Sequence, residues 1–112
     1  METDSLGERL VVFVTTPVGE LPAQIARAVV EEGLAACVNI LPQIRSLYFW
    51  DGAVQDDAEQ LLIMKTTADR FEALERRIRE LHTYDVAEVI ALPIGRGSQD
   101  YLDWVTDMCH RT

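Results

Sequence analysis

Residues able to bind a metal ion or to transfer a proton gather between positions 82 and 88: His82, Tyr84, Asp85 and Glu88. An imidazole near a carboxylate suits a transition metal such as copper or zinc better than a hard cation such as Mg²⁺. We therefore take His82 and Glu88 as candidate ligands of Cu²⁺ or another divalent cation. The alternative is structural: His82 would end a helix, where the helix dipole favours it, and Glu88 would be a surface residue of a strand.

Three further side chains could line a binding cleft together with Tyr84. Tyr48 and Trp50 lie just before the dipeptide Asp51-Gly52, and Lys65 follows a run of apolar residues. A histidine, a lysine and a carboxylate could support acid–base chemistry. The sequence has no Cys-x-x-Cys pair, no nucleophile elbow and no glycine-rich phosphate loop, so nothing marks a nucleophile or an organic cofactor. We therefore expect a binding protein rather than an enzyme.

The two cysteines, Cys37 and Cys109, are too few for a disulfide framework. Free cysteine is among the most buried residue types, so we expect Cys37 to be a buried, inert thiol with a structural role. Cys109 is followed by His110 near the end of the chain. This pair could take up a metal opportunistically and is a rival to the site at His82.

Charge and hydropathy restrict the partners. The net charge of −9 argues against binding to nucleic acids and to anionic membranes. The first ten residues, METDSLGERL, include acidic residues and no apolar segment, so we expect no signal peptide. No apolar run approaches the roughly 20 residues of a membrane span. We expect a cytoplasmic protein.

A long β-hairpin over residues 34–66 is the strongest structural signal. Asp51-Gly52 between two strand-like runs is typical of a tight hairpin turn. Pro42 cannot donate to a strand ladder, so we expect a bulge or kink there. Leu61 to Met64 are apolar at four successive positions, which places apolar side chains on both faces of a strand. The chain is short, so a second copy of the protein is the natural cover for one of these faces. Structural roles are assigned to Cys37, Asn39, Pro42 and Gly52.

The remaining elements follow from periodicity and capping residues. We expect strands at 10–15 and 86–94, a helix with Pro22 in its first turn, and two further helices with Thr67 and Ser98 as their N-caps. Gly33 is the expected residue after the first helix. The order β-α-β-β-α-β plus a terminal helix predicts an α+β, ferredoxin-like sandwich with two helices on one face of an antiparallel sheet. Residues 8–112 would form one domain, after a flexible tail over 1–7.

Five blocks of sequence carry a family resemblance. They are GLAACVNILP at 33–42, SLYFWDG at 46–52, LIMKTTADRFEALE at 62–75, ALPI at 91–94 and YLDW at 101–104. In this order they resemble the CutA family, the divalent-cation-tolerance proteins. The resemblance implies a homotrimer with hairpin arms that engage other subunits, an architecture like that of the PII signalling proteins, and a role in copper or other divalent-metal tolerance. It also implies that His82, Tyr84 and Glu88 lie in a cleft between subunits. No enzymatic activity is established for this family.

The sequence departs from the family pattern at two places. Where the family has His-Pro-Tyr-Asp-Val-Pro-Glu, Thr83 and Ala87 replace the two prolines, which removes two backbone constraints from the loop. Where some relatives have a cysteine on the first strand that joins the histidine and glutamate, this chain has Val14. We therefore expect a weaker copper site. The alternative function is that of a PII-like signalling or scaffold trimer that binds a small metabolite or a partner protein.

Overall fold

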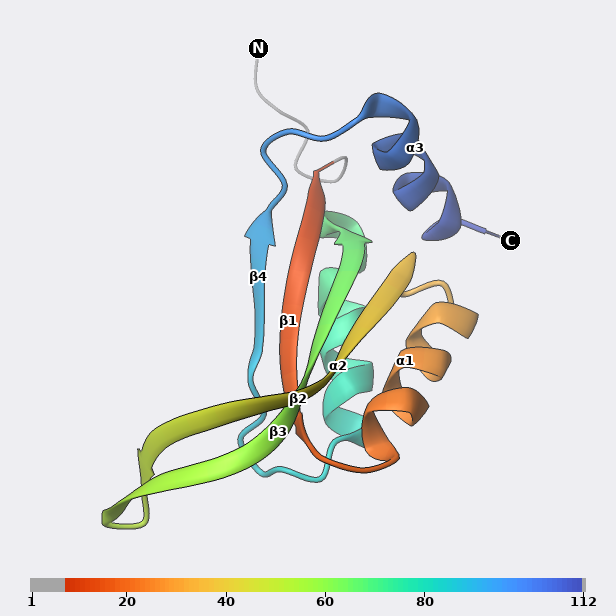
Figure 1. Cartoon of the computed structure of the whole chain (residues 1–112). Coiled ribbons are helices and arrows are strands. Elements are labelled where there is room, and N and C mark those ends of the chain that lie inside the picture. Colours follow the sequence, from red (N-terminus) through yellow and green to blue (C-terminus); the bar gives the residue numbers. More distant parts are fainter. Residues whose placement is uncertain (1–7, 112) are drawn as a thin grey trace.

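A four-stranded antiparallel sheet in the order β2-β3-β1-β4 organises the chain (Figure 1). The computed structural model describes residues 8–111, and the expected tail at 1–7 lies outside these residues. The elements agree with the α+β, ferredoxin-like order predicted from the sequence. They are β1 (Arg9–Pro17), α1 (Leu21–Glu31), β2 (Cys37–Trp50), β3 (Ala53–Thr67), a 3₁₀ turn η2 (Ala68–Arg70), α2 (Phe71–Leu81), β4 (Val89–Pro93) and α3 (Gln99–Met108).

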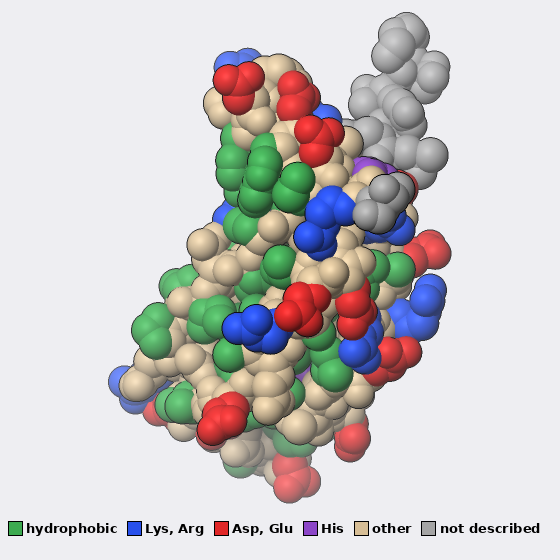
Figure 2. Space-filling view, turned by 90° about the vertical axis from the view of Figure 1, so that its right-hand side faces the viewer, with side chains coloured by type: hydrophobic (Ala, Val, Ile, Leu, Met, Phe, Trp, Pro, Cys, Tyr) green, Lys and Arg blue, Asp and Glu red, His purple; other side chains and the backbone are tan. Residues whose placement is uncertain are grey.

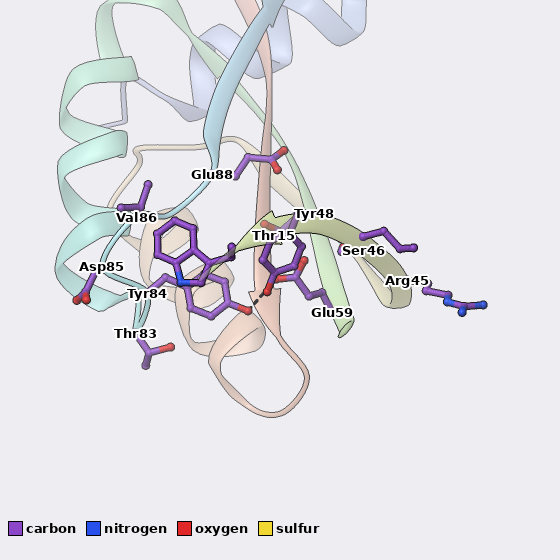
Figure 3. Close-up of a pocket in the computed structure, with 12 residues that line it drawn as sticks. Thr15, Arg45, Ser46, Tyr48, Glu59, Thr83, Tyr84, Asp85, Val86 and Glu88 are labelled. Carbon is purple, nitrogen blue, oxygen red and sulfur yellow. Dashed lines mark hydrogen bonds between the residues drawn. The ribbon is translucent and has the colours of Figure 1, made fainter. Parts of the chain in front are cut away.

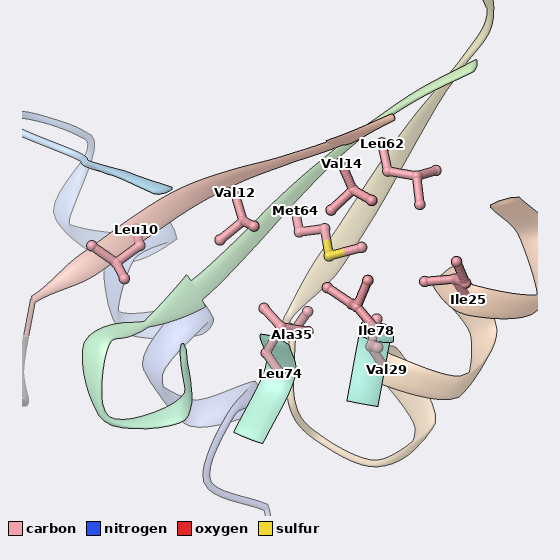
Figure 4. Packing of buried hydrophobic residues seen from close by; sticks show 10 residues of the cluster. All are labelled: Leu10, Val12, Val14, Ile25, Val29, Ala35, Leu62, Met64, Leu74 and Ile78. Carbon is pink, nitrogen blue, oxygen red and sulfur yellow. The ribbon is translucent and has the colours of Figure 1, made fainter. Parts of the chain in front are cut away.

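The hydrophobic core lies between the sheet and the helices α1 and α2 (Figure 4). Alternate residues of β1 and β3 point into it because successive side chains of a strand face opposite sides. Val12, Val14, Leu62 and Met64 are fully buried there. The helices contribute residues at helical spacing, namely Ile25 and Val29 from α1 and Leu74 and Ile78 from α2.

The opposite face of the sheet is apolar but only partly covered. Leu61 and Ile63 alternate with the buried residues of β3 and are half-buried. On β4, Ile90 and Leu92 are 53% and 54% exposed. The prediction that Leu61 to Met64 present apolar groups on both faces is therefore confirmed. By contrast, acidic and basic side chains are interspersed on the side of the molecule that carries α1 and α3 (Figure 2).

The predicted turn closes the hairpin. Asp51 and Gly52 have φ angles of 54° and 78°, as a two-residue hairpin turn of type I′ requires. β3 pairs with β1 only from Glu59 to Thr67, whereas it pairs with β2 as far as Ala53. The hairpin therefore extends beyond the rest of the sheet (Figure 1). The register shifts between Leu41 and Ile44, which confirms the irregularity expected at Pro42.

Two predicted boundaries were wrong. The last strand begins at Val89 rather than at 86, because the Thr15 carbonyl that a longer β4 would use is bound by the His82 ring, with Nε2 at 2.8 Å. Thr67 does not cap a helix with its side chain: it is the last residue of β3, and the turn η2 separates it from α2. Ser98 does cap α3, because its hydroxyl accepts a hydrogen bond from the Tyr101 N–H.

In the part of the chain that the structure describes, no helix combines the length and apolar character that a membrane crossing needs.

Candidate functional site

A pocket of about 780 Å³ lies between the hairpin and the loop that connects α2 to β4 (Figure 3). Its position follows from the fold, because the hairpin extends past the sheet beside this loop. β1 and β3 contribute Thr15 and Glu59. The hairpin contributes Arg45–Tyr48 and Trp50, and the loop contributes Thr83–Val86 and Glu88.

Glu59 places a carboxylate at the base of the hairpin. Its side chain is only 6% exposed, and Oε2 accepts a hydrogen bond of 2.7 Å from Tyr84 Oη. Burial and this hydrogen bond raise the pKa of the Tyr84 phenol well above its ordinary value, so the phenol keeps its proton. The hydrogen bond from Tyr84 therefore fixes the position of the Glu59 carboxylate, and both residues line the pocket.

His82 is a support of the pocket rather than part of its lining. The backbone N–H of Tyr84 donates to Nδ1 at 3.1 Å, so the ring proton lies on Nε2 and is donated to the Thr15 carbonyl at 2.8 Å. The imidazole also contacts the Tyr84 ring in a tilted arrangement, with a centroid distance of 4.7 Å and an interplanar angle of 38°. Both ring nitrogens are thus engaged within the protomer, and the ring fixes Tyr84 against β1. A metal could bind His82 only after one of these hydrogen bonds is broken.

Of the other predicted residues, the pocket brings together Tyr48, Trp50, Tyr84 and Glu88. Glu88 is exposed on the edge that precedes β4. Among residues 8–111, no three histidine, cysteine or acidic side chains form a group that could hold a metal ion. Val14 is fully buried in the core, whereas its neighbour Thr15 lines the pocket. The described residues of one protomer therefore do not complete a metal site.

Lys65 lies elsewhere, on the partly covered face of the sheet. Its ammonium group is 3.7 Å from Cys37 Sγ and hydrogen-bonds the Asn39 side chain. Tyr101 Oη is 3.6 Å from the same sulfur. Burial and the nearby Cys37 raise the pKa of Tyr101 to about 12. Cys37 is thus half-buried among polar groups rather than fully buried, and Lys65 does not join Tyr84 and Trp50.

The rival pair at the C-terminus is divided between two environments. Cys109 is fully buried with its sulfur 3.7 Å from Thr66 Oγ1, and burial raises the pKa of its thiol. His110 instead bonds the Asp69 carboxylate through Nε2 at 2.7 Å. The two side chains therefore do not face a common point in this structure.

The sequence did not indicate Glu59 or Thr15 as pocket residues. Glu59 is surrounded in sequence by other acidic and polar residues, Asp56, Asp57 and Gln60. It is buried where β3 pairs with Ile44 on one side and Pro17 on the other, and where Tyr84 of the distant loop reaches it. Alternation along β3 places Glu59 on the same face as Leu61 and Ile63, but it does not show that this loop covers the position.

Comparisons with known proteins give a consistent result. The family described as "CutA1 divalent ion tolerance protein" matches residues 10–108. "Divalent-cation tolerance protein CutA" of Thermus thermophilus is 50% identical over 97 residues, which are 87% of this chain and 94% of that protein. "Protein CutA" of Mus musculus is 50% identical over 93 residues, which are 83% of this chain but 52% of that protein. The chain thus spans about half of the mouse relative.

Solved structures agree with these matches over the whole fold. The crystal structure of CutA1 from Oryza sativa superposes with a TM-score of 0.91 at 44% identity, and the match covers 97% of this chain and 100% of that one. Sequence and fold therefore lead to the same conclusion: the chain belongs to the CutA1 divalent ion tolerance family.

Proposed function

We propose that this protein is a homotrimer that binds a divalent cation, with copper as the leading candidate, at the pocket between the hairpin and the loop before β4. The names of its relatives, divalent-cation tolerance proteins, support the class of ligand. The observation that carries the location is the pocket lining. Glu59, Asp85 and Glu88 supply three carboxylates. Among the described residues that line the pocket, Arg45 alone is basic, and it is paired with Asp56 at 2.7 Å.

A second subunit would complete the cation site. The acidic residues of the pocket do not converge as a group of three within the described part of one protomer, so a firmly bound ion requires a donor from elsewhere. The hairpin is suited to bring a second subunit to the pocket, because it extends beyond the sheet and presents the apolar side chains of Leu47 and Phe49, which are 62% and 71% exposed. The apolar face of the sheet, with Ile90 and Leu92, offers a further surface for assembly.

Copper binding by His82 and Glu88 would be modest. His82 must give up its hydrogen bond to the Thr15 carbonyl or to the Tyr84 N–H before it can bind a metal, and the free energy of that bond is subtracted from the affinity. Val14 provides no thiolate, which is the softer ligand that copper(I) prefers. Carboxylates of the pocket are then the principal ligands, with His82 as a contributor in the assembled trimer.

Calorimetric titration with Cu²⁺, Zn²⁺ and Mg²⁺, together with light scattering, tests this function. We expect binding by the trimer, a large loss of affinity in Glu88→Gln, and a partial loss in His82→Ala. Glu72→Gln is a matched control because Glu72 lies on the exposed face of α2, away from the pocket. Loss of copper binding in His110→Ala, with Glu88→Gln unaffected, would place the metal at the C-terminus and contradict the proposal.

A second candidate function, binding of a small metabolite, is favoured by the size and the aromatic lining of the same pocket. The cytoplasmic location also remains a proposal, and fractionation of cells that produce the protein tests it.

A further inference from the structure

A small second core attaches the C-terminal half of α3 to the rest of the protomer. Val105 and Cys109 are fully buried and pack with Ala36, and Met108 lies against them. This cluster is separate from the main core between the sheet and the helices α1 and α2. Because the cluster is small, its burial contributes little free energy, and the polar contacts at this end of α3 supply much of the attachment.

The three residues that follow α3, Cys109, His110 and Arg111, form what we call the C-terminal latch. The Cys109 carbonyl accepts a hydrogen bond of 2.7 Å from Arg70 Nε on η2. Arg111 Nη2 donates to the Val30 carbonyl at 2.6 Å, where the end of α1 lies beneath the end of α3 (Figure 1). The latch thus joins α3 to two other elements. All of these contacts lie within one protomer, so they do not depend on how copies assemble.

His110 is the part of the latch that responds to pH. Its Nε2 lies 2.7 Å from the Asp69 carboxylate on η2, and its Nδ1 lies 2.7 Å from the Thr106 carbonyl on α3. Both partners are acceptors, so the ring satisfies both only when each nitrogen carries a proton, which is the charged form. A neutral ring must give up one of these two hydrogen bonds.

The charges around His110 favour the protonated ring. The hydrogen bond to Asp69 is the largest influence and raises the pKa of His110 above 6.5, and the Thr106 carbonyl acts in the same direction. Partial burial and the guanidinium of Arg70 oppose protonation without outweighing it. The place of His110 just after α3 also suits a positive charge, because the carbonyl end of a helix is the negative end of its dipole.

We propose that the C-terminal half of α3 is a pH-dependent lid over the Cys109 thiol. With His110 protonated, the latch is complete and the lid is closed. When the ring loses its proton, its ion pair with Asp69 and one hydrogen bond are lost, so the lid opens more often. The Cys109 sulfur, which lies 3.7 Å from Thr66 Oγ1 in the closed form, then becomes accessible. This lid does not depend on the proposed cation site.

Reaction of Cys109 with a dipyridyl disulfide measures the opening. The chain has two cysteines, so a full chain with Cys37→Ser leaves Cys109 as its single thiol. The thiol forms a mixed disulfide with one half of the reagent, and the released thiopyridone is counted by its absorbance. The observed rate is the open fraction multiplied by the rate of the exposed thiol, which itself changes with pH. The ratio of variant to parent at a single pH cancels that second factor.

Two latch variants should differ in their pH dependence. His110→Gln should accelerate the reaction about threefold at pH 5.5 and hardly at all at pH 8.5, because only the protonated ring closes the lid. Arg111→Gln removes a contact that does not titrate in this range, so its acceleration should be similar at both pH values. Glu72→Gln, on the exposed face of α2, should react as the parent does. Low concentrations of urea should hardly change the rate, since a local opening exposes little surface.

An equal acceleration by His110→Gln at pH 5.5 and pH 8.5 would overturn the inference. So would a parent rate that rises with urea as steeply as global unfolding does, because Cys109 would then react only in the unfolded protein. If Cys37→Ser does not fold, mass spectrometry of peptides from the natural chain measures the modification of Cys109 separately. The copper titration tests the cation site by itself, so the two proposals stand or fall independently.

Discussion

At the scale of single residues, the two histidines occupy opposite environments. His82 has one ring nitrogen against a carbonyl and the other against a backbone N–H, so the neutral ring fits. His110 has both nitrogens against acceptors, the Thr106 carbonyl and the Asp69 carboxylate, each at 2.7 Å. The protonated ring suits that arrangement. Residue type alone could not show that His82 holds a loop whereas His110 forms an ion pair. That difference depends on the neighbours that the fold brings to each ring.

His82→Ala should destabilise the protein by about 1–3 kcal/mol, because it leaves the Thr15 carbonyl and the Tyr84 N–H without partners in a mostly buried place. Urea unfolding followed by circular dichroism measures the change. Thr83→Ala, at the exposed neighbouring position, should change stability by less than about 0.5 kcal/mol. Equal stability of His82→Ala and the parent would show that the ring does not hold the loop.

Ion pairing of His110 should make stability depend on pH. Hydrogen bonds to Asp69 and to the Thr106 carbonyl raise the pKa of His110 above 6.5. For Asp69, partial burial opposes the shift, but the hydrogen bond to His110 lowers the pKa below 3.8. A raised histidine pKa stabilises the fold below about 6.5, and this contribution is lost as the pH rises through the folded-state pKa. The lowered Asp69 pKa adds stability that is lost as the pH falls through its own value.

The free energy of unfolding lost in His110→Gln should therefore be larger at pH 5.5 than at pH 8.5. Because the pair is partly exposed, we expect a difference below about 1 kcal/mol. Urea titrations at both pH values measure it, and Asp69→Asn should reduce the pH dependence of the loss without abolishing it, because the Thr106 carbonyl still favours the protonated ring. A greater loss of unfolding free energy at pH 8.5 than at pH 5.5 would contradict a stabilising role of the protonated His110 ring.

At the scale of elements, local signals were reliable where the backbone alone decides. Gly33 ends α1 with φ of 71°, Asp51-Gly52 forms the turn, and Ser98 caps α3. The missed boundaries depend on distant partners: His82 takes the carbonyl that would extend β4, and Thr67 stays in β3 because it pairs with Arg9. The residues of the candidate site also differ in this way. Those in the loop before β4 could be predicted from local sequence, whereas the place of Glu59 in the pocket depends on distant partners.

Gly52→Ala should destabilise the hairpin by about 1 kcal/mol through backbone conformation alone. Gly52 has φ of 78°, and an added Cβ would meet no atom within 4 Å, so steric contact with neighbours contributes nothing. Gly95→Ala is the matched control, because Gly95 also has open space but no positive φ. Thermal unfolding of both variants distinguishes them. A loss of the same size in Gly95→Ala would mean that the turn conformation is not the cause.

At the scale of the whole molecule, the protomer is elongated, with extents of 48 × 29 × 23 Å, because the hairpin extends beyond the sheet. A lone hairpin of this length has little to stabilise its tip, since two-stranded ribbons are marginal in water. Its exposed Phe49 and Trp50, and the open apolar face at Ile90 and Leu92, are both explained if other copies cover them. Composition could indicate the need for a partner, but the number of subunits came only from the family resemblance.

The outer face of the sheet should therefore hold the proposed trimer together. Ile90→Asp leaves the core of the protomer intact, because Ile90 is 53% exposed, but places a charge in the proposed interface. Val18→Asp is the control, at a position 55% exposed in the turn after β1. Sedimentation should find three chains for the parent and for Val18→Asp.

Ile90→Asp should sediment as a smaller species at the same micromolar concentration, because the buried interface no longer compensates the desolvation of its carboxylate. Folding is then coupled to assembly, so the thermal midpoint of the parent should rise with protein concentration, whereas that of Ile90→Asp should depend on it less. A parent protein that sediments as a single chain, with a midpoint independent of concentration, would show that the exposed apolar face serves another partner.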